Sequence, residues 1–323
     1  RGLGDVYKRQ AYIPPTIAGI VLAYRGKLLA GGILTAFFIA LQIMSNHVQM
    51  SYYFLFVILF IAGAYFEDAW RNKTLPKFFK ASAVVFVAAL IGVAANLSNL
   101  YHTYTYSKET MRGKSELVET GDAAKQTSSG LDRDYITNWS YGIGETWTLL
   151  VPNFKGGSSS APLSQSEAAM EKANPMYGSL YNSLPQYFGS QPWTAGPVYV
   201  GAFVLFLFVL GCFIVKGPLK WALLGATFFS IVLAWGKNFM PLTDFFIDYV
   251  PMYNKFRAVS SILVIAEFTI PLLAIFALKR VLEEPGIWKA NKKAFGISLA
   301  LTAGVALLLT CLLYTSPSPR DCS

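Results

Sequence analysis

The sequence predicts an all-α fold, a polytopic transmembrane helix bundle, and two patterns lead to that prediction. Eight apolar stretches run through the chain, and most approach the roughly 17–25 residues that a helix needs to cross a bilayer. Every second connector between them is basic, whereas the others are poor in charge or long. The stretches are residues 13–24, 28–44, 50–66, 78–97, 197–215, 219–235, 258–278 and 294–310.

The basic connectors predict the orientation of the bundle. Lysine and arginine are retained on the cytoplasmic side of a membrane, so the basic connectors are expected to face the cytoplasm. Residues 11–97 would then form spans one to four, 98–196 a long extracytoplasmic loop region, and 197–310 spans five to eight. The basic residues are Arg25 and Lys27, then Arg71, Lys73, Lys77 and Lys80, then Lys216 and Lys220, then Lys279, Arg280, Lys289, Lys292 and Lys293.

Both ends of the chain read as translated sequencing-adapter residues and are left out of the fold prediction. Residues 5–10 are DVYKRQ, which GATGTGTATAAGAGACAG encodes, and the reverse complement of that oligonucleotide encodes the CLLYT that opens residues 311–323. We therefore expect residues 11–310 to be an internal fragment of a longer protein. Without these ends the net charge falls from +9 to +7, and one of three cysteines, Cys212, remains as a small apolar packing residue.

Composition and motifs exclude several function classes. The positive charge lies in the connectors, so it indicates no nucleic-acid partner, which would call for a basic patch on a soluble domain. One cysteine forms no disulfide framework and no metal-type cluster, so no metal site is predicted. The chain has no phosphate loop, dinucleotide fingerprint, nucleophile elbow or zinc-protease motif. Neither ATP nor a nucleotide sugar is expected to be used directly, and any cofactor is unknown.

The long loop region has parts of different character. Residues 98–111 are expected to prolong the fourth helix beyond the membrane. Residues 113–130 are polar and predict a mobile loop. The Gly/Ser-rich residues 156–166 predict a flexible segment.

Polar residues collect between the second and third stretches. Asn46 and His47, with Gln49, form a set of groups that could face a lipid-linked or sugar substrate. A turn at the level of the lipid headgroups also tolerates such residues, so both interpretations stay open. A lone histidine is a weak signal for a metal.

Residues 237–257 are denser in charged and aromatic groups. Asp244 and Asp248 are four residues apart, so they share one face of a short helix. Apolar residues between them predict an amphipathic helix lying in the membrane interface. Lys255 and Arg257 follow, just before the seventh stretch, where basic side chains suit a lipid phosphate. Anchoring to headgroups is the alternative.

Two further acidic residues are candidates. Glu267 lies near the middle of the seventh stretch, where an ionisable group normally faces a cavity or a partner. Pro271, four residues later, is expected to kink that helix. Glu145 is flanked by glycines in the long loop region and reads either as a surface carboxylate or as a functional one.

Four strings resemble the YfhO-type bacterial membrane proteins, a family similar to the GT-C superfamily of integral-membrane glycosyltransferases. They are NLSNLYHTYTYSKETMRGKSEL, GLDRDYITNWSYGIGETWTLLVPNFKGG, QPWTAGPVYVGA and WGKNFMPLTDFFIDYVPMYNKFRAVSSILVIAEFTIPLLA. The resemblance covers nearly all of residues 11–310. It implies a GT-C-like bundle in the bacterial inner (cytoplasmic) membrane that moves a sugar from a polyprenyl-phosphate donor to a cell-envelope glycopolymer or glycolipid acceptor. It also implies an essential acidic residue in a first outer loop, before Ala11.

Sugar transfer needs groups that this chain offers at its outer side. A carboxylate must take the proton of the acceptor hydroxyl, and positive charge must stabilise the departing phosphate. The carboxylate candidates are Asp244, Asp248 and Glu145. The candidates for binding substrate are Asn46, His47, Arg112, Lys255, Arg257 and Glu267.

Two other functions stay open. A transporter or flippase of a lipid-linked envelope intermediate would suit Glu267 and the kink at Pro271, and would show paired repeats with broken helices. A membrane assembly scaffold would use the long loop region to bind partners, and none of its outer carboxylates would matter.

Overall fold

The computed structural model describes residues 3–45, 47–108, 131–171 and 173–315, and within these ranges every regular element is a helix. The all-α prediction is therefore confirmed. Isolated bridges at Phe154–Gly156 and Pro162–Pro185 are the β contacts of the described chain, and they form no strand.

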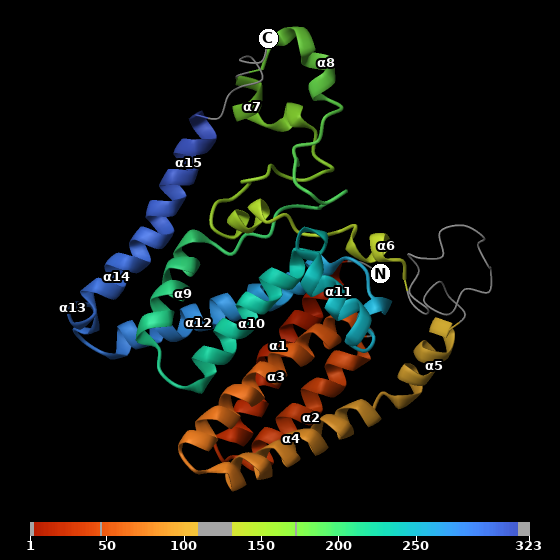
Figure 1. The fold of residues 1–323 in the computed structure, drawn as a ribbon, viewed down its shortest axis with the longest axis vertical. Coiled ribbons are helices and arrows are strands. Elements are labelled where there is room, and N and C mark those ends of the chain that lie inside the picture. Colours follow the sequence, from red (N-terminus) through yellow and green to blue (C-terminus); the bar gives the residue numbers. More distant parts are fainter. Residues whose placement is uncertain (1–2, 46, 109–130, 172, 316–323) are drawn as a thin grey trace.

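The first half of the chain folds into four helices packed side by side (Figure 1). Helix α1 packs along α2, and α2 packs along α4. A short helix, α5, follows α4 after a two-residue turn, in line with the expected prolongation of the fourth helix. The bounds are α1 (Leu3–Tyr24), α2 (Leu28–Met44), α3 (Val48–Arg71), α4 (Leu75–Ala94) and α5 (Leu97–Lys108).

Close contact between α1 and α2 depends on glycine. A Cβ on Gly31 would lie 2.6 Å from the backbone nitrogen of Ala23 and 2.7 Å from the carbonyl oxygen of Gly19. The two backbones therefore touch at a point where any side chain would separate them. Small residues at helix contacts are the usual means of packing helices in a membrane.

The second half forms another group of helices. Helix α12 packs against α9 and α10, and α10 also packs against α3, which joins the two groups. Their bounds are α9 (Ala202–Ile214), α10 (Pro218–Ala234), η4 (Gly236–Phe239), α11 (Met240–Tyr249), η5 (Tyr253–Lys255), η6 (Val259–Leu263), α12 (Val264–Glu283), α13 (Ile287–Ala290), α14 (Lys292–Leu299), η7 (Ala300–Gly304) and α15 (Val305–Thr315).

The long loop region contains only short helices where the structure describes it (Figure 1). Residues 113–130, expected to be mobile, lie outside the described residues. The short helices are α6 (Arg133–Thr137), η1 (Gly144–Leu149), η2 (Leu163–Gln165), α7 (Glu167–Glu171), η3 (Pro175–Tyr177) and α8 (Gly178–Tyr181).

The Gly/Ser-rich segment 156–166 is held by hydrogen bonds, contrary to the expectation of a free flexible segment. The amide of Ser159 donates to the carbonyl of Thr194 at 2.9 Å. The amide of Leu163 donates to the carbonyl of Leu184, and the amide of Gln186 donates to the carbonyl of Ala161. Composition predicted flexibility because small residues order at an entropic cost. Residues 184–194, which we call the returning arm, supply the partners that offset this cost.

All eight apolar stretches are helical over most of their length, and several are suited to a membrane. Among the described residues, four helices are long and apolar enough to cross a bilayer: Val48–Arg71, Leu75–Ala94, Val259–Glu283 and Lys292–Cys311. Helices α10 and α11 make a fifth if the pair, bent by 106°, is one broken span. Three others, Ala11–Tyr24, Leu28–Met44 and Ala202–Ile214, are shorter apolar helices of 10–17 residues. The fold is thus that of a helical membrane protein, and eight crossings stay a prediction.

The basic connectors gather at one end of the bundle, which we call the basic end. Tyr24, beside Arg25, stacks on Tyr65 and Phe78 with ring centroids 4.9 and 5.4 Å apart, so the first and third connectors meet. Arg71 shares a cavity with Gly217, so the third and fifth connectors are neighbours. The fifth also meets the seventh, because a guanidinium nitrogen of Arg280 donates to the carbonyl of Ile214 at the end of α9.

The opposite end, which we call the loop end, carries the described part of the long loop region. The side chain of Gln49 donates to the carbonyl of Arg257 at 2.7 Å. The amide of Tyr141 donates to the carbonyl of Ala234 at 2.8 Å, and that of Leu131 donates to the carbonyl of Asn254 at 2.9 Å. Residues far apart in sequence therefore meet above the ends of α3, α10 and α12.

This separation of the two ends leads to a topology prediction. Reporter fusions after Arg25, Lys73, Lys220 and Lys289 are expected to report the cytoplasm, and fusions at residues 121–128 and at Asn238 the outside. The measurement is activity of paired reporters that work on opposite sides of the membrane. An outside signal at Lys73 together with a cytoplasmic signal at Asn238 would invert the proposed orientation.

Candidate functional site at the loop end

Arg257 is the centre of the candidate site. Its Nη1 donates to the hydroxyl of Tyr135 at 2.8 Å. The guanidinium carbon lies 5.9 Å from the ring centroid of Tyr135 and 5.8 Å from that of Trp139. The side chain is exposed, and Arg257 forms no ion pair with any carboxylate of the described residues. A cation held between two aromatic rings and open to solvent is ready to bind an anion.

The backbone around Arg257 adopts conformations that are uncommon for these residues. Ala258 has φ 60° and Met252 has φ 68°, both in the left-handed region. Side chains in this region cost of order 1 kcal/mol or more each and persist where the surroundings hold them in place. The bond from Gln49 to the Arg257 carbonyl and the buried ring of Tyr253 supply such a hold.

The aromatic wall of the site is tied to the helices beneath it. Trp139 Nε1 donates to the carbonyl of Trp193 at 3.2 Å, and the Trp139 carbonyl accepts from the amide of Ser260 at 3.1 Å. Gly236 permits the close approach at this point. It has φ 47°, and a Cβ there would collide with Ser140 Oγ. The tryptophan is therefore placed by bonds to both the returning arm and the start of η6.

Asp244 and Asp248 share one cation. Arg133 of α6 forms ion pairs with Asp244 Oδ1 and, at 2.5 Å, with Asp248 Oδ1. The hydrogen bond to Asp248, with the charge of both carboxylates, raises the pKa of Arg133 above its usual value. The three side chains are 31–43% exposed, so each pair contributes only about 1 kcal/mol or less. Both aspartates thus face a guanidinium that joins the loop region to α11.

The short helix that carries these aspartates agrees with its sequence pattern. Helix α11 buries Thr243, Phe246 and Ile247 and leaves Phe245 and Asp248 exposed. Its axis departs from that of α10 by 106°. This is the amphipathic helix expected between the sixth and seventh stretches, and its placement in a membrane interface remains an expectation.

Glu145 is buried, with 2% of its surface exposed, and lies within a closed hydrogen-bond network. Its Oε2 accepts from the amide of Gly142 at 2.5 Å, and its Oε1 accepts from the amide of Ser190 at 3.2 Å and from the hydroxyl of Tyr187. A Cβ on Gly189 would collide with that Oε1. The surface-carboxylate interpretation is therefore wrong. The geometry favours a carboxylate that fastens the returning arm to residues 142–149.

Two tyrosines around Glu145 are held in the protonated form. Burial, with the hydrogen bond to Glu145 as a further cause, raises the pKa of Tyr187 well above its usual value. Burial is also the main cause that raises the pKa of Tyr141 to about 12, and the charges of Glu145 and Glu267 add to it. Both hydroxyls therefore act as donors within the network at any ordinary pH.

Glu267 does not lie at the middle of its helix, as the sequence suggested. The seventh stretch begins with the 3₁₀ turn η6, so α12 starts at Val264 and Glu267 falls in its first turn, where it is exposed. The charge of Glu267 contributes to the raised pKa of Tyr141, so Glu267 lies near that residue of the loop region. Pro271 lies inside α12 without ending that helix.

The other predicted binding residues are spread around the same end. His47 is the residue before the first turn of α3, and Lys255 ends the turn η5, two residues before Arg257. Asn46 and Arg112 lie outside the described residues. In the part of the chain that the structure describes, no group of three or more His, Cys, Asp or Glu side chains could hold a metal ion.

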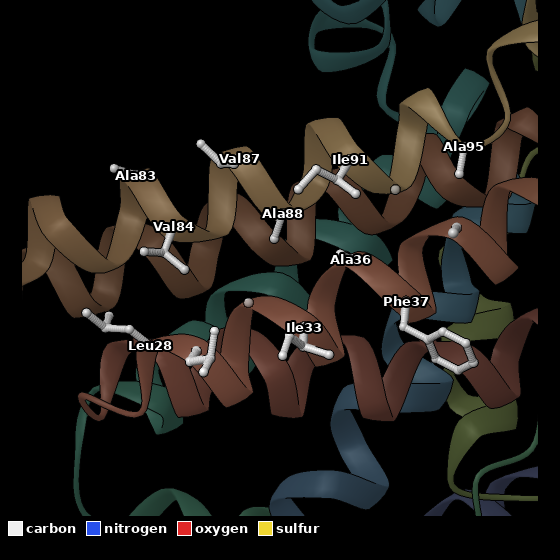
Figure 2. A pocket seen from close by; sticks show the side chains of 14 residues that line it. Leu28, Ile33, Ala36, Phe37, Ala83, Val84, Val87, Ala88, Ile91 and Ala95 are labelled. Atoms are coloured by element: carbon white, nitrogen blue, oxygen red, sulfur yellow. The ribbon is translucent and has the colours of Figure 1, made fainter.

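Two grooves follow the helices. One, of about 490 Å³, runs between α3 and α10 from Phe246 of α11 to Glu67 near the basic end. The other, of about 680 Å³, lies between α2 and α4 (Figure 2). The residues lining the second groove are Gly, Ala, Val, Ile, Leu and Phe, so it offers no side chain for acid–base or phosphate chemistry.

Sequence patterns missed three functional neighbours. Arg133 stands between two aspartates in the sequence, but its ion-pair partners lie on α11, more than 100 residues away. Tyr135 and Trp139 belong to an aromatic-rich segment, but spacing alone does not indicate that they face Arg257.

The fold and this site together define a class, an all-helical membrane protein with an aromatic-lined arginine at one end of its bundle. No protein-family model, no curated protein and no solved structure matches the chain.

Proposed function

We propose that this chain is part of a membrane glycosyltransferase, which transfers a sugar from a polyprenyl-phosphate donor to a cell-envelope acceptor at the loop end. The observation that carries the proposal is Arg257, an exposed cation without an ion-pair partner among the described residues, between the rings of Tyr135 and Trp139. The guanidinium suits the departing phosphate. The apolar faces of the two rings suit a sugar.

The α3–α10 groove supports a lipid-linked donor. It is apolar along Phe56, Phe60 and Gly225 and reaches α11, the helix that Arg133 joins to α6. A hydrocarbon chain in this groove would bring its phosphate toward the loop end. The hydrocarbon chain would stay in an apolar environment, and the phosphate would lie outside the groove, as the hydrophobic effect requires.

The three candidate carboxylates are engaged in other contacts. Asp244 and Asp248 bind Arg133, and Glu145 accepts three hydrogen bonds. These contacts favour a general base other than these three residues, in agreement with the expectation of an essential acidic residue before Ala11. Asp244, Asp248 and Glu145 stay candidates until transfer is measured.

The break between α10 and α11 favours a second candidate, a transporter or flippase of a lipid-linked intermediate. Discontinuous helices mark substrate sites in many transporters, where they occur at corresponding positions of two repeats. Within the described residues, α10–α11 is the one apolar helix pair broken in this way.

The test separates the two activities in one preparation. We expect the full-length protein, reconstituted in liposomes with a labelled polyprenyl-phosphate sugar, to move label to an added glycan or glycolipid acceptor. We expect residues 11–310 alone to insert but to transfer nothing, and the natural preceding sequence to restore transfer. Movement of the labelled lipid across the bilayer without transfer would assign a flippase. The absence of both activities would favour the assembly scaffold. Transfer by residues 11–310 alone would place the base among Asp244, Asp248 and Glu145.

A further inference from the structure

A cavity at the basic end lies apart from the proposed site. It has a volume of about 480 Å³ and lies between the end of α9 and the segment α13–α14. Its lining combines three lysines, Lys289, Lys292 and Lys293, with the apolar side chains of Phe213, Ala294 and Ile297.

Other cations in this part of the basic end already have partners. Arg280 pairs with Glu284, and this hydrogen bond lowers the pKa of the Glu284 carboxyl. Lys279 lies 3.7 Å from Glu283. Lys220 donates to the carbonyl of Cys212 at 3.3 Å and lies over the ring of Trp221. The nearby acidic side chains are thus occupied.

The three cavity lysines differ from these neighbours. Lys289, Lys292 and Lys293 are exposed and form no ion pair with any described carboxylate, and no acidic residue lines the cavity. Lys292 and Lys293 also open α14, the end of a helix where its dipole favours anions over cations. Three like charges around one cavity repel one another, and an anion bound among them would relieve that repulsion.

The apolar lining residues of the cavity select the kind of anion. Phe213 is 49% exposed on α9, and Ile297 is 46% exposed on a helix whose apolar stretch is only 11% buried. These side chains continue the apolar flank of the bundle. A small inorganic anion would use the lysines alone, whereas an amphipathic anion would use both the lysines and the apolar residues.

We propose that this cavity binds the headgroup of an anionic phospholipid, with its phosphodiester among Lys289, Lys292 and Lys293. Its acyl chains would lie along Phe213 and Ile297. Basic pockets between helices at the cytoplasmic side of a membrane suit such headgroups. The site is at the opposite end of the bundle from Arg257 and does not depend on the proposed transfer reaction.

The test compares two triple variants of equal charge change. The purified chain in detergent is titrated with phosphatidylglycerol, and bound lipid is counted by native mass spectrometry. Lys289→Gln/Lys292→Gln/Lys293→Gln is expected to weaken binding roughly 100-fold, because each lysine contributes about a factor of five. Lys73→Gln/Lys77→Gln/Lys80→Gln removes three exposed lysines of the same end outside the cavity, and is expected to leave binding as it was.

Two further arms identify the ligand. Phe213→Ala keeps every charge and is expected to weaken binding about tenfold through the lost apolar contact. Phosphatidylcholine is expected to bind weakly, and millimolar inorganic phosphate to leave phosphatidylglycerol in place. Equal losses in the two triple variants would reduce the site to diffuse surface charge. Displacement by inorganic phosphate would make it a simple anion site, and either result overturns the proposal.

Discussion

Replacement of Arg257 by alanine in the full-length protein is expected to lower the rate of sugar transfer by about 10²–10³, the usual cost of losing one charge stabiliser in a transition state. The nearest other arginine among the described residues of the loop end is already engaged. Arg133 is the other arginine placed nearby, and Asp244 and Asp248 hold it. The measurement is kcat and KM for transfer from a polyprenyl-phosphate sugar. A loss that lies mainly in kcat would place the guanidinium at the reacting phosphate.

Lys237 offers a matched control for this prediction. It is an exposed cation of the same end, and its Nζ lies 3.5 Å from the carbonyl of Ser190. Lys237→Ala is expected to change transfer little. Arg257→Lys keeps the charge but loses the planar fork and its stacking, so an intermediate rate is expected. Similar small effects at Arg257 and Lys237 would reduce Arg257 to a headgroup anchor.

Replacement of Glu145 by alanine is expected to cost on the order of 3 kcal/mol of stability, because three donors, two of them in buried residues, lose their acceptor together. These donors are the amides of Gly142 and Ser190 and the hydroxyl of Tyr187. The returning arm should lose stability before the helices do. Hydrogen exchange across residues 186–194 measures it directly, since local opening exposes these amides.

The Glu145→Gln variant distinguishes a structural role of Glu145, which is to hold the returning arm in place, from a role as the catalytic base. An amide has the same shape and can still accept at one oxygen, but its NH₂ group faces a backbone donor. Partial loosening of residues 186–194 with a matching loss of transfer would indicate a carboxylate that holds the arm. Full protection of these amides with transfer abolished would instead make Glu145 the catalytic base. Gly189→Ala is a second probe, since its Cβ would displace the same carboxylate.

The helices and the two ends of this protein are readable from sequence. Each of the eight apolar stretches is helical over most of its length, because a run of apolar residues in lipid leaves the backbone no partner except itself. The alternation of lysine and arginine predicted that Arg71 and Lys216 would share an end with Arg280, and contacts among the connectors agree. The amphipathic spacing of Asp244 and Asp248 likewise predicted α11.

Two errors show where local patterns fail. The sequence predicts Glu267 near the middle of a helix, whereas Ala258 takes a left-handed conformation, the 3₁₀ turn η6 precedes α12, and Glu267 falls in the first turn of α12. Nothing in residue spacing encodes that turn. The depth of Glu267 in a membrane stays a prediction. Segment 156–166 looked flexible because its composition is poor in large side chains, and its order comes from partners at 184–194.

Sequence alone thus determined the class of fold, the helical segments and which connectors share an end, because these follow from hydrophobicity, charge and local periodicity. Only the tertiary structure decided which charges are engaged. It assigned Arg133 to Asp244 and Asp248, buried Glu145 against Tyr187, and left Arg257 open between two rings. The physical reason is that ion pairs and buried hydrogen bonds depend on distances of a few ångströms between residues up to 115 positions apart.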